Sequence, residues 1–382
     1  MNFKLLDDDH AMLEMFQTFT KQVVAPWSSR VEKGESTREV IAEMANAGLV
    51  GMVAPEEYGG SDCTYLQLTL AMEEIGRYSA AIADHLNMSN CNLILPLMQL
   101  GSEEQKRTWI PRIASGEGFV AFALTEPGAG SDTMGMSCRA VEDGDDYIIN
   151  GQKCFITDAA EANIYMVFAV TSPPDAPRKE VTAFLLDRSV SGKGISVGKA
   201  EPTMGMNGSP IFDIFFEDVR VPKANIVGGL GGGFQVAMIG LNPGRCALSA
   251  AALGMAQRSI DDAVAYAKGR KMFGKTLAGF QNTQFVLAEA QSRVDAGRLM
   301  VQKAAVSLDQ GEDAAQLCAE AKLIACEAAK DAVDVCLQLY GGYGYSKEYH
   351  IEQAYRDVRI FTIFEGTSEV QKHVIAKYMG LR

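Results

Sequence analysis

The sequence predicts an α+β protein with three parts: an N-terminal helical domain, a central antiparallel β-barrel or sandwich, and a C-terminal four-helix bundle. Apolar residues recur near every 3.6 positions through residues 1–115, which indicates amphipathic helices. Short β-branched and aromatic runs between Gly, Asp and Pro turns fill residues 116–227. Residues 228–382 are rich in Ala, Leu, Met and Gln, and the 12 prolines all lie at or before Pro243. We therefore expect domains at 1–115, 116–227 and 228–382.

The first domain is expected to be helical over residues 6–24, 36–49, 63–78, 80–100 and 103–114, with a turn-rich break at 54–62. Ser36, followed three residues later by Glu39, predicts a capping box, and Gly48 a stop for the same helix. Ser102 is expected to cap the last of these helices.

In the central domain, strands are expected over 118–124, 147–157, 164–170, 181–187 and 211–221, because these runs are short and rich in β-branched and aromatic residues. In the last domain, helices are expected over 232–266, 280–309 and 312–339. Each of these is long enough for four turns or more, and Ala-rich helices of this length usually pack as an up-and-down bundle.

Charge and composition exclude several classes of function. With 35 Lys and Arg against 48 Asp and Glu, the net charge of −13 argues against nucleic acid as a partner. No long apolar run predicts a membrane span, and the acidic N-terminus is not a signal peptide. The eight cysteines lack CxxC spacing and are expected to be reduced, and the four histidines form no metal constellation. A cytoplasmic bacterial protein fits best, with a processed mitochondrial matrix protein as the alternative.

Four segments carry a resemblance to a known family. They are FALTEPGAGSD (122–132), NGQKCFITDA (150–159), RKMFGK (270–275) with Gln281, and the run from QLYGG to EGTSEVQ (338–371). Together they resemble the acyl-CoA dehydrogenases, FAD enzymes that introduce an α,β double bond into acyl-CoA thioesters. The resemblance covers essentially the whole chain, and the order helical, β, helical agrees with the architecture of that family.

The resemblance implies an FAD site shared between two subunits. Glycines in TEPGAGSD allow close approach to a flat ligand, although alone they would indicate only a turn. Phe155 stands where the family usually has Trp, and by itself would be taken for a core aromatic. The implied contacts to the flavin part are Phe122, Leu124, Thr125, Gly130, Ser131, Phe155, Ile156, Thr157, Thr367 and Glu369. A second set of FAD contacts is implied from across a dimer interface: Arg270, Phe273, Gln281, Gln338, Leu339, Gly341 and Gly342. This shared site suggests a homotetramer built as a dimer of dimers.

Glu365 in IFEGTSE is the implied catalytic base. A Glu before a helix start is ordinarily a surface residue, and Thr367 is expected to cap that helix. In the family the base removes the pro-R α-proton while the β-hydride passes to flavin N5, and the electrons then go to electron-transfer flavoprotein. The enolate oxygen is held by the backbone N–H of the base and a ribityl hydroxyl. Some branches carry the base at the position that is Gly244 here.

The implied substrate contacts are Asp84, Ser131, Asn242, Arg245, Phe364 and Gly366. Asn242 replaces the Asp of the usual L-D-x-x-R pattern, and Asn207 stands where Arg is common. Because the protein is anionic, CoA phosphates need local donors, of which Arg245 is one candidate.

The acyl group is left open by the sequence. The segment ADHLNMSNCN (83–92) is unusually polar for a fatty-acyl lining. Either these residues face solvent or a neighbouring helix, or they line a site for a short, cyclic or polar acyl group. An alicyclic (cyclohexane or cyclohexene carboxyl-type) acyl-CoA dehydrogenase would use Asp84 as a second acid/base. The sequence is also compatible with an acyl-CoA oxidase, with a reductase or lyase on a modified acyl-CoA, and with a non-catalytic acyl-CoA- and FAD-binding protein.

Overall fold

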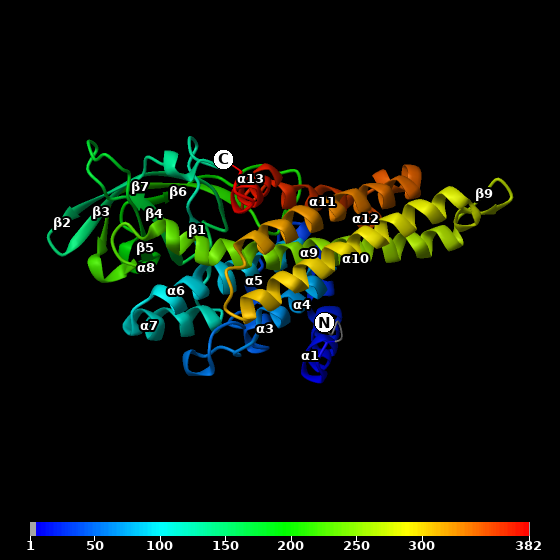
Figure 1. Ribbon diagram of the computed structural model, residues 1–382, viewed down its shortest axis with the longest axis horizontal. Coiled ribbons are helices and arrows are strands. Elements are labelled where there is room, and N and C mark those ends of the chain that lie inside the picture. The colour runs from blue at the N-terminus through cyan, green and yellow to red at the C-terminus, as the bar shows by residue number, and fades with distance from the viewer. Residues whose placement is uncertain (1–4, 382) are drawn as a thin grey trace.

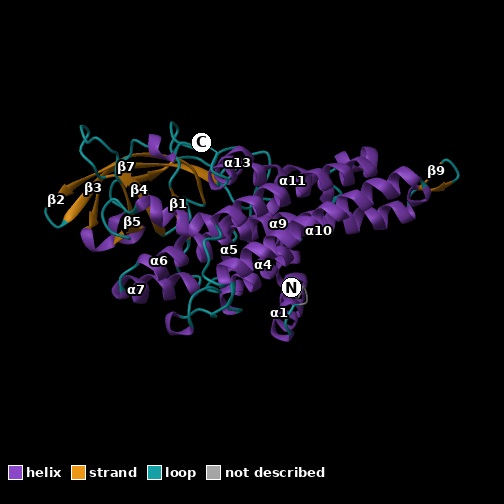
Figure 2. Ribbon diagram, in the orientation of Figure 1, coloured by secondary structure: helices purple, strands orange, loops and turns teal. Residues whose placement is uncertain are grey.

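The computed structural model describes residues 5–381 as an elongated molecule, with a sheet at one end and long helices running to the other (Figure 1). Along the chain, helices come first and last and the strands lie between them, and in space the strands gather at one end of the molecule (Figure 2). The predicted three-part order is therefore confirmed. The N-terminal part holds α1 (Asp7–Phe19), α2 (Ala25–Glu32), α3 (Arg38–Asn46), α4 (Tyr65–Gly76), α5 (Ala80–Asn87), α6 (Leu95–Leu100) and α7 (Glu103–Ala114).

Ser102 and Ser36 show where local capping signals hold and where they fail. Ser102 caps α7 as predicted, because its Oγ accepts from the backbone N–H of Gln105. The capping box predicted at Ser36 is wrong. Helix α3 begins at Arg38 without a side-chain cap, and the Ser36 hydroxyl instead donates to the Glu161 carboxylate at 2.6 Å.

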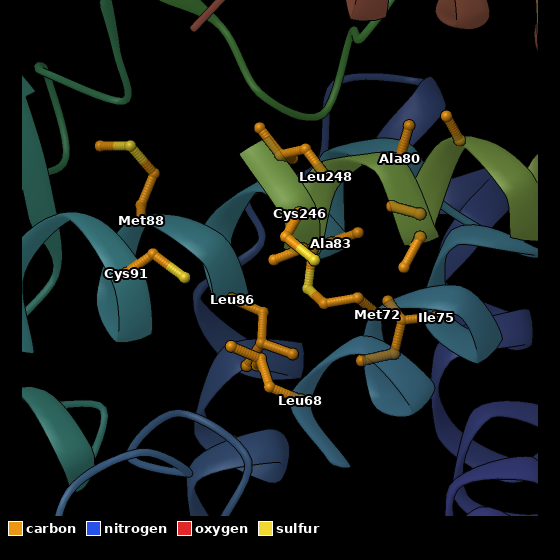
Figure 3. Packing of buried hydrophobic residues seen from close by; sticks show 14 of the residues in the cluster. Leu68, Met72, Ile75, Ala80, Ala83, Leu86, Met88, Cys91, Cys246 and Leu248 are labelled. Carbon is orange, nitrogen blue, oxygen red and sulfur yellow. The ribbon is translucent and has the colours of Figure 1, made fainter. Parts of the chain in front are cut away.

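The predicted helix over 80–100 is interrupted by a π-helical segment, η3 (Met88–Ile94), between α5 and α6. Every residue from Ala80 to Leu97 is buried. Figure 3 shows Leu86 and Met88 near Cys246 and Leu248 of the following long helix, within the main hydrophobic core. This packing fixes the rotation of η3 about its axis, and π turns of this kind often occur at functional sites.

The central part is one eight-stranded sheet in the order β6-β7-β3-β2-β4-β5-β8, with β1 also paired to β4. Most neighbours are antiparallel as predicted, but β4 pairs in parallel with β1 and β2. The five predicted strands are confirmed, and the three missed ones are short. The strands are β1 (Val120–Ala123), β2 (Arg139–Asp143), β3 (Asp146–Thr157), β4 (Ile164–Val170), β5 (Val181–Asp187), β6 (Ile195–Val197), β7 (Ile211–Pro222) and β8 (Ile226–Val227).

The C-terminal part is built on three long helices that pack on one another, and α4 of the first part also packs on two of them. Helix α9 is long and apolar enough to cross a membrane, but 83% of its most apolar window is buried within the protein, as in a core helix. The elements are α9 (Gly233–Gly269), β9 (Lys271–Met272), β10 (Lys275–Thr276), α10 (Gln281–Asp309), α11 (Ala315–Tyr340), α12 (His350–Val358) and α13 (Ser368–Tyr378). The eight cysteines are free thiols, seven of them buried.

Candidate active site

Glu365 lies in the loop between α12 and α13 with a backbone conformation that non-glycine residues rarely adopt. Its φ is +51°, and that of the following Gly366 is +95°. A left-handed non-glycine residue costs free energy and persists only where its surroundings enforce it, which is common at functional sites. Thr367 caps α13 as predicted, its Oγ1 accepting from the Val370 N–H at 3.2 Å.

Buried cations enforce this loop conformation. Arg245 of α9 donates from Nε to the Glu365 carbonyl at 3.1 Å. Lys322 of α11 donates from Nζ to the carbonyls of Phe361 and Gly366 at 2.8 and 2.9 Å. Lys322 is 1% exposed, and burial lowers its pKa. The loop is therefore held by two helices of the bundle.

Two amides of the polar segment hold the carboxylate itself. Oε1 of Glu365 accepts from Nδ2 of Asn87 at 2.8 Å and from Nδ2 of Asn92 at 3.0 Å. Oε2 is buried and has no hydrogen-bond partner among the described residues. Burial raises the pKa of Glu365, and the hydrogen bonds from Asn92 and Asn87 oppose that rise. The result is a carboxylate with one bonded and one free oxygen.

Arg245 lies beside Glu365 as expected. It is 5% exposed, and its Nη1 donates to Oδ1 of Asn242 at 2.9 Å. These contacts engage the guanidinium within the core, and its role toward CoA phosphates stays a prediction. The same contact explains Asn242, whose amide oxygen accepts this hydrogen bond as a carboxylate would.

The remaining polar residues of 83–92 face neighbouring elements rather than solvent. Ser209 Oγ donates to Oδ2 of Asp84 at 3.0 Å, and His85 Nε2 lies 2.7 Å from Thr37 Oγ1. Asn90 Nδ2 donates to the carbonyls of Leu49 and Leu86. Of the interpretation that they face solvent or a neighbouring helix, the first half is therefore wrong for Asp84, His85 and Asn90, which are buried against neighbouring elements.

Residues expected around the flavin gather on the sheet domain. Phe155 is not a core aromatic, since its side chain is 61% exposed and its φ is +55°. A register shift between Lys153 and Ile156 in the β3–β7 pairing turns it outward. Thr125 and Ser131 lie in the turn that begins directly after β1, with Gly130 open to approach on its Cβ side. An exposed aromatic beside open backbone and hydroxyl groups fits one face of a flat cofactor.

The other expected cofactor contacts lie at the opposite end of the molecule, around β9 (Figure 1). Arg270 and Phe273 flank β9; the Phe273 side chain is 87% exposed, and Arg270 lies over the Tyr343 ring at 5.5 Å. Gln281, Gln338 and the stretch 341–342 are at least partly exposed as well, and Gly341 has open space on its Cβ side. An exposed cation with aromatic and backbone neighbours fits the phosphates and adenine of FAD.

A hollow of ≈ 410 Å³ opens beside β5 and the start of α9. Arg178 and Lys179 line it together with Phe234 and Gly231. An adjoining apolar pocket reaches Met238, about one helical turn before Asn242 on α9. The hollow therefore brings two basic side chains at the surface close to the start of α9, the helix that carries Asn242 and Arg245.

Sequence reasoning missed two of the residues that hold the base. Asn92 and Lys322 carry no motif, and a Lys in an Ala-rich helix ordinarily faces solvent. Of the expected contacts that remain, Leu124 and Phe122 lie partly buried against the main core, and Phe364 packs on Phe361 at 5.2 Å between ring centres.

Comparisons with known proteins identify the family of the chain. Models of the N-terminal, middle and C-terminal domains of acyl-CoA dehydrogenases match residues 7–117, 121–219 and 231–380. The chain is 42% identical over 371 residues to a 3-(aryl)acrylate reductase of Clostridium sporogenes, covering 97% of this chain and 98% of the relative. It is 40% identical over 345 residues to subunit CarC of a caffeyl-CoA reductase-Etf complex of Acetobacterium woodii, covering 90% of each.

The fold is shared as well. Butyryl-CoA dehydrogenase of Megasphaera elsdenii matches with a TM-score of 0.94 at 37% identity, covering 99% of this chain and 100% of that one. The chain therefore belongs to the acyl-CoA dehydrogenase family, and it is an FAD-dependent oxidoreductase that acts on acyl-CoA.

Proposed function

We propose that the protein catalyses α,β-dehydrogenation of an acyl-CoA thioester with Glu365 as the base. The observation that carries this proposal is the buried carboxylate with one oxygen bonded by two amides and the other left free. A proton acceptor needs such a free oxygen in a site that excludes water. Bound FAD would supply the acceptor for the electron pair and hydrogen that leave the β-carbon.

The same loop offers a donor for the charge that develops on the thioester oxygen. Among residues 5–381, the backbone N–H of Glu365 has no acceptor. A thioester α-proton is too weakly acidic for a carboxylate unless the enolate oxygen is stabilised. We assign that role to the Glu365 N–H, which the neighbouring Arg245 and Lys322 hold in place.

The test is an anaerobic titration of the purified yellow protein with straight, branched, cyclic, aryl and dicarboxylic acyl-CoAs. We expect at least one class to bleach the flavin absorbance within one equivalent. A protein that is purified without FAD and does not take it up, or that no acyl-CoA bleaches, would overturn the proposal.

The proposal also covers the electron acceptor and the assembly of the protein. We assign electron-transfer flavoprotein as the acceptor, since the Acetobacterium relative belongs to a reductase-Etf complex. The two half-sites at opposite ends of one chain support a dimer, and we propose a homotetramer in the cytoplasm. The three domains at 1–115, 116–227 and 228–382 remain part of this proposal.

The second candidate is the opposite direction, reduction of an α,β-unsaturated acyl-CoA. It is favoured by two similar relatives that carry reductase names. Here Glu365 would hold the proton and give it to the α-carbon. Steady-state turnover distinguishes the directions: faster turnover of an arylacryloyl-CoA with reduced electron-transfer flavoprotein than of its saturated counterpart with the oxidised flavoprotein supports reduction, and the opposite order supports dehydrogenation.

Arg178 and Lys179 are proposed to bind the phosphates of CoA in the hollow beside β5. Replacing both by Ala should raise KM about tenfold for an acyl-CoA, because two charge-assisted contacts near solvent are lost. KM for the matching pantetheine thioester, which lacks the nucleotide phosphates, should not change. Arg293→Ala on α10 is the matched control, and an equal rise for both thioesters would contradict the assignment.

Asp84 is predicted to make stability depend on pH. Burial, and then the charge of Glu365, raises its pKa from 3.8 to about 7. The folded protein therefore keeps a proton that the unfolded chain releases, so this contribution to stability is full below pH 3.8 and is lost as the pH rises through 7. Asp84→Asn should gain on the order of 3 kcal/mol over the wild type at pH 8 and less at pH 5, measured by urea unfolding.

The same variant tests the alicyclic hypothesis. A second acid/base role predicts that Asp84→Asn loses turnover of cyclohexanecarboxyl-CoA while butyryl-CoA turnover persists.

For the stability prediction, a gain from Asp84→Asn that is equal at pH 5 and pH 8 would show that Asp84 is ionised in the folded protein.

A further inference from the structure

We propose that Asn87 and Asn92 are positioning residues that fix Oε1 of Glu365 and leave Oε2 as the one oxygen that exchanges a proton with the α-carbon. The proposal rests on Glu365 being the base. It goes further by assigning separate tasks to the two carboxylate oxygens and by naming the residues that separate them.

The π-helical segment is what brings the two amides together. Residues five apart in an α-helix point about 140° away from each other, because successive residues rotate by about 100°. In a π turn the i→i+5 hydrogen bond stacks such residues on one face. Asn87 ends α5 and Asn92 lies within η3, and both Nδ2 atoms reach the same oxygen, at 2.8 and 3.0 Å. A regular helix would present only one of them.

A third element closes the cluster from the opposite side. Oε2 of Glu365 and the Oδ1 atoms of Asn87 and Asn92 are buried without hydrogen-bond partners among the described residues. A Cβ at Gly244 of α9 would lie 2.8 Å from Oε2 and 3.1 and 3.4 Å from these two oxygens. Three acceptor oxygens therefore converge where α9 has no side chain. Any side chain at 244 would push the carboxylate away from the amides.

This arrangement sets the protonation of the base. Two N–H donors stabilise the charged carboxylate in a site where burial alone favours the neutral acid. Arg245 and Lys322 donate to backbone carbonyls and not to the carboxylate oxygens. The difference between Oε1 and Oε2 therefore comes from the hydrogen bonds of the two amides. The other charged or titratable groups that face Glu365 are Arg245 of α9, Lys322 of α11, Asp84 of α5 and Cys91 of η3.

The experiment compares Asn87→Leu and Asn92→Leu with Asn90→Leu. All three remove a buried amide from one helical segment, but Asn90 bonds only to backbone groups of Leu49, Leu86 and Val53. The rate of flavin bleaching and the exchange of α-protons in D₂O are measured as a function of pH across the range in which the folded protein is stable. Because the amides oppose the raised pKa of Glu365, we expect the acidic limb to move to higher pH in the first two variants, with rates about tenfold lower at the acidic end of that range and KM little changed. Asn90→Leu should lower the thermal midpoint and leave the pH profile in place.

Gly244→Ala tests the cluster without removing either amide and also serves if a Leu variant fails to fold. The added methyl gains helix propensity but would lie 2.8 Å from the buried Oε2, so the pH profile and not the thermal midpoint is the readout, and it should shift in the same direction as in the Asn variants. A wild-type profile in Asn87→Leu, Asn92→Leu or Gly244→Ala would overturn the proposal. Failure of the proposed function looks different, because α-proton exchange would then survive in Glu365→Gln.

Discussion

Replacing Glu365 by Gln is expected to lower kcat about 10⁴-fold while FAD stays bound, the upper range for loss of a general base. Gln keeps the size of the side chain and can still accept from Asn87 and Asn92 through its amide oxygen, but it cannot take up a proton. The loop is held by backbone contacts to Arg245 and Lys322, so its conformation should persist. The measurements are steady-state turnover and the rate of flavin bleaching after rapid anaerobic mixing.

Glu104→Gln is the matched control, because it removes the same charge from the exposed surface of α7 and should leave both rates unchanged. The variant at 365 should also still shift the flavin spectrum when acyl-CoA binds, which separates lost chemistry from lost binding. Full bleaching by Glu365→Gln at the wild-type rate would show that another group takes the α-proton.

The fold could be predicted where local signals decide it. The Ala-rich region predicted α9, α10 and α11, even though Pro243 lies within α9, and Ser102 capped α7, because propensity and capping act over a few residues. Ser36 shows the limit of such signals. Its hydroxyl bonds to Glu161, which is 125 positions away in the sequence, and no local pattern reveals that partner. The parallel pairing of β1 with β4 likewise depends on how the whole sheet packs.

In the candidate site, too, the residues that belong to a local motif could be predicted and those that depend on distant contacts could not. Glu365, Arg245 and Thr367 lie where the motifs indicated, since each belongs to a run of matched residues. Asn92 was missed because residues five apart do not share a face of an α-helix, so its spacing from Asn87 indicates no common partner. No local sequence signal predicts the π turn that brings the two together. As part of the polar segment 83–92, Asn87 is predicted only to line the acyl site or to face solvent or a neighbouring helix. Its actual partner is the base, 278 positions further along the chain.

Replacing Arg270 by Ala is the second large expected effect, a loss of about 100-fold in FAD affinity. The guanidinium is exposed at the β9 end, and losing charge-assisted hydrogen bonds to a diphosphate costs about 1.5–3 kcal/mol. The measurement is release of flavin on dilution, followed by fluorescence. Arg293→Ala, an exposed cation on α10 that pairs with Glu289, is the control and should retain FAD.

Mixing the two variants tests whether each FAD site is built from two chains. In a mixed dimer of Arg270→Ala and Glu365→Gln, one site takes its base from the first chain and its arginine from the second, so that site is intact while the other carries both defects. Random pairing of equal amounts makes about half of the dimers mixed, so about one quarter of wild-type activity should return when the subunits are unfolded and refolded together with FAD. Each variant refolded alone should stay inactive at FAD concentrations that saturate only wild type. No recovery from the mixture would place Arg270 and Glu365 of the same chain at one site. Their separation argues against this, because Arg245, which contacts the Glu365 loop, and Arg270 at the end of α9 are about 37 Å apart along that helix.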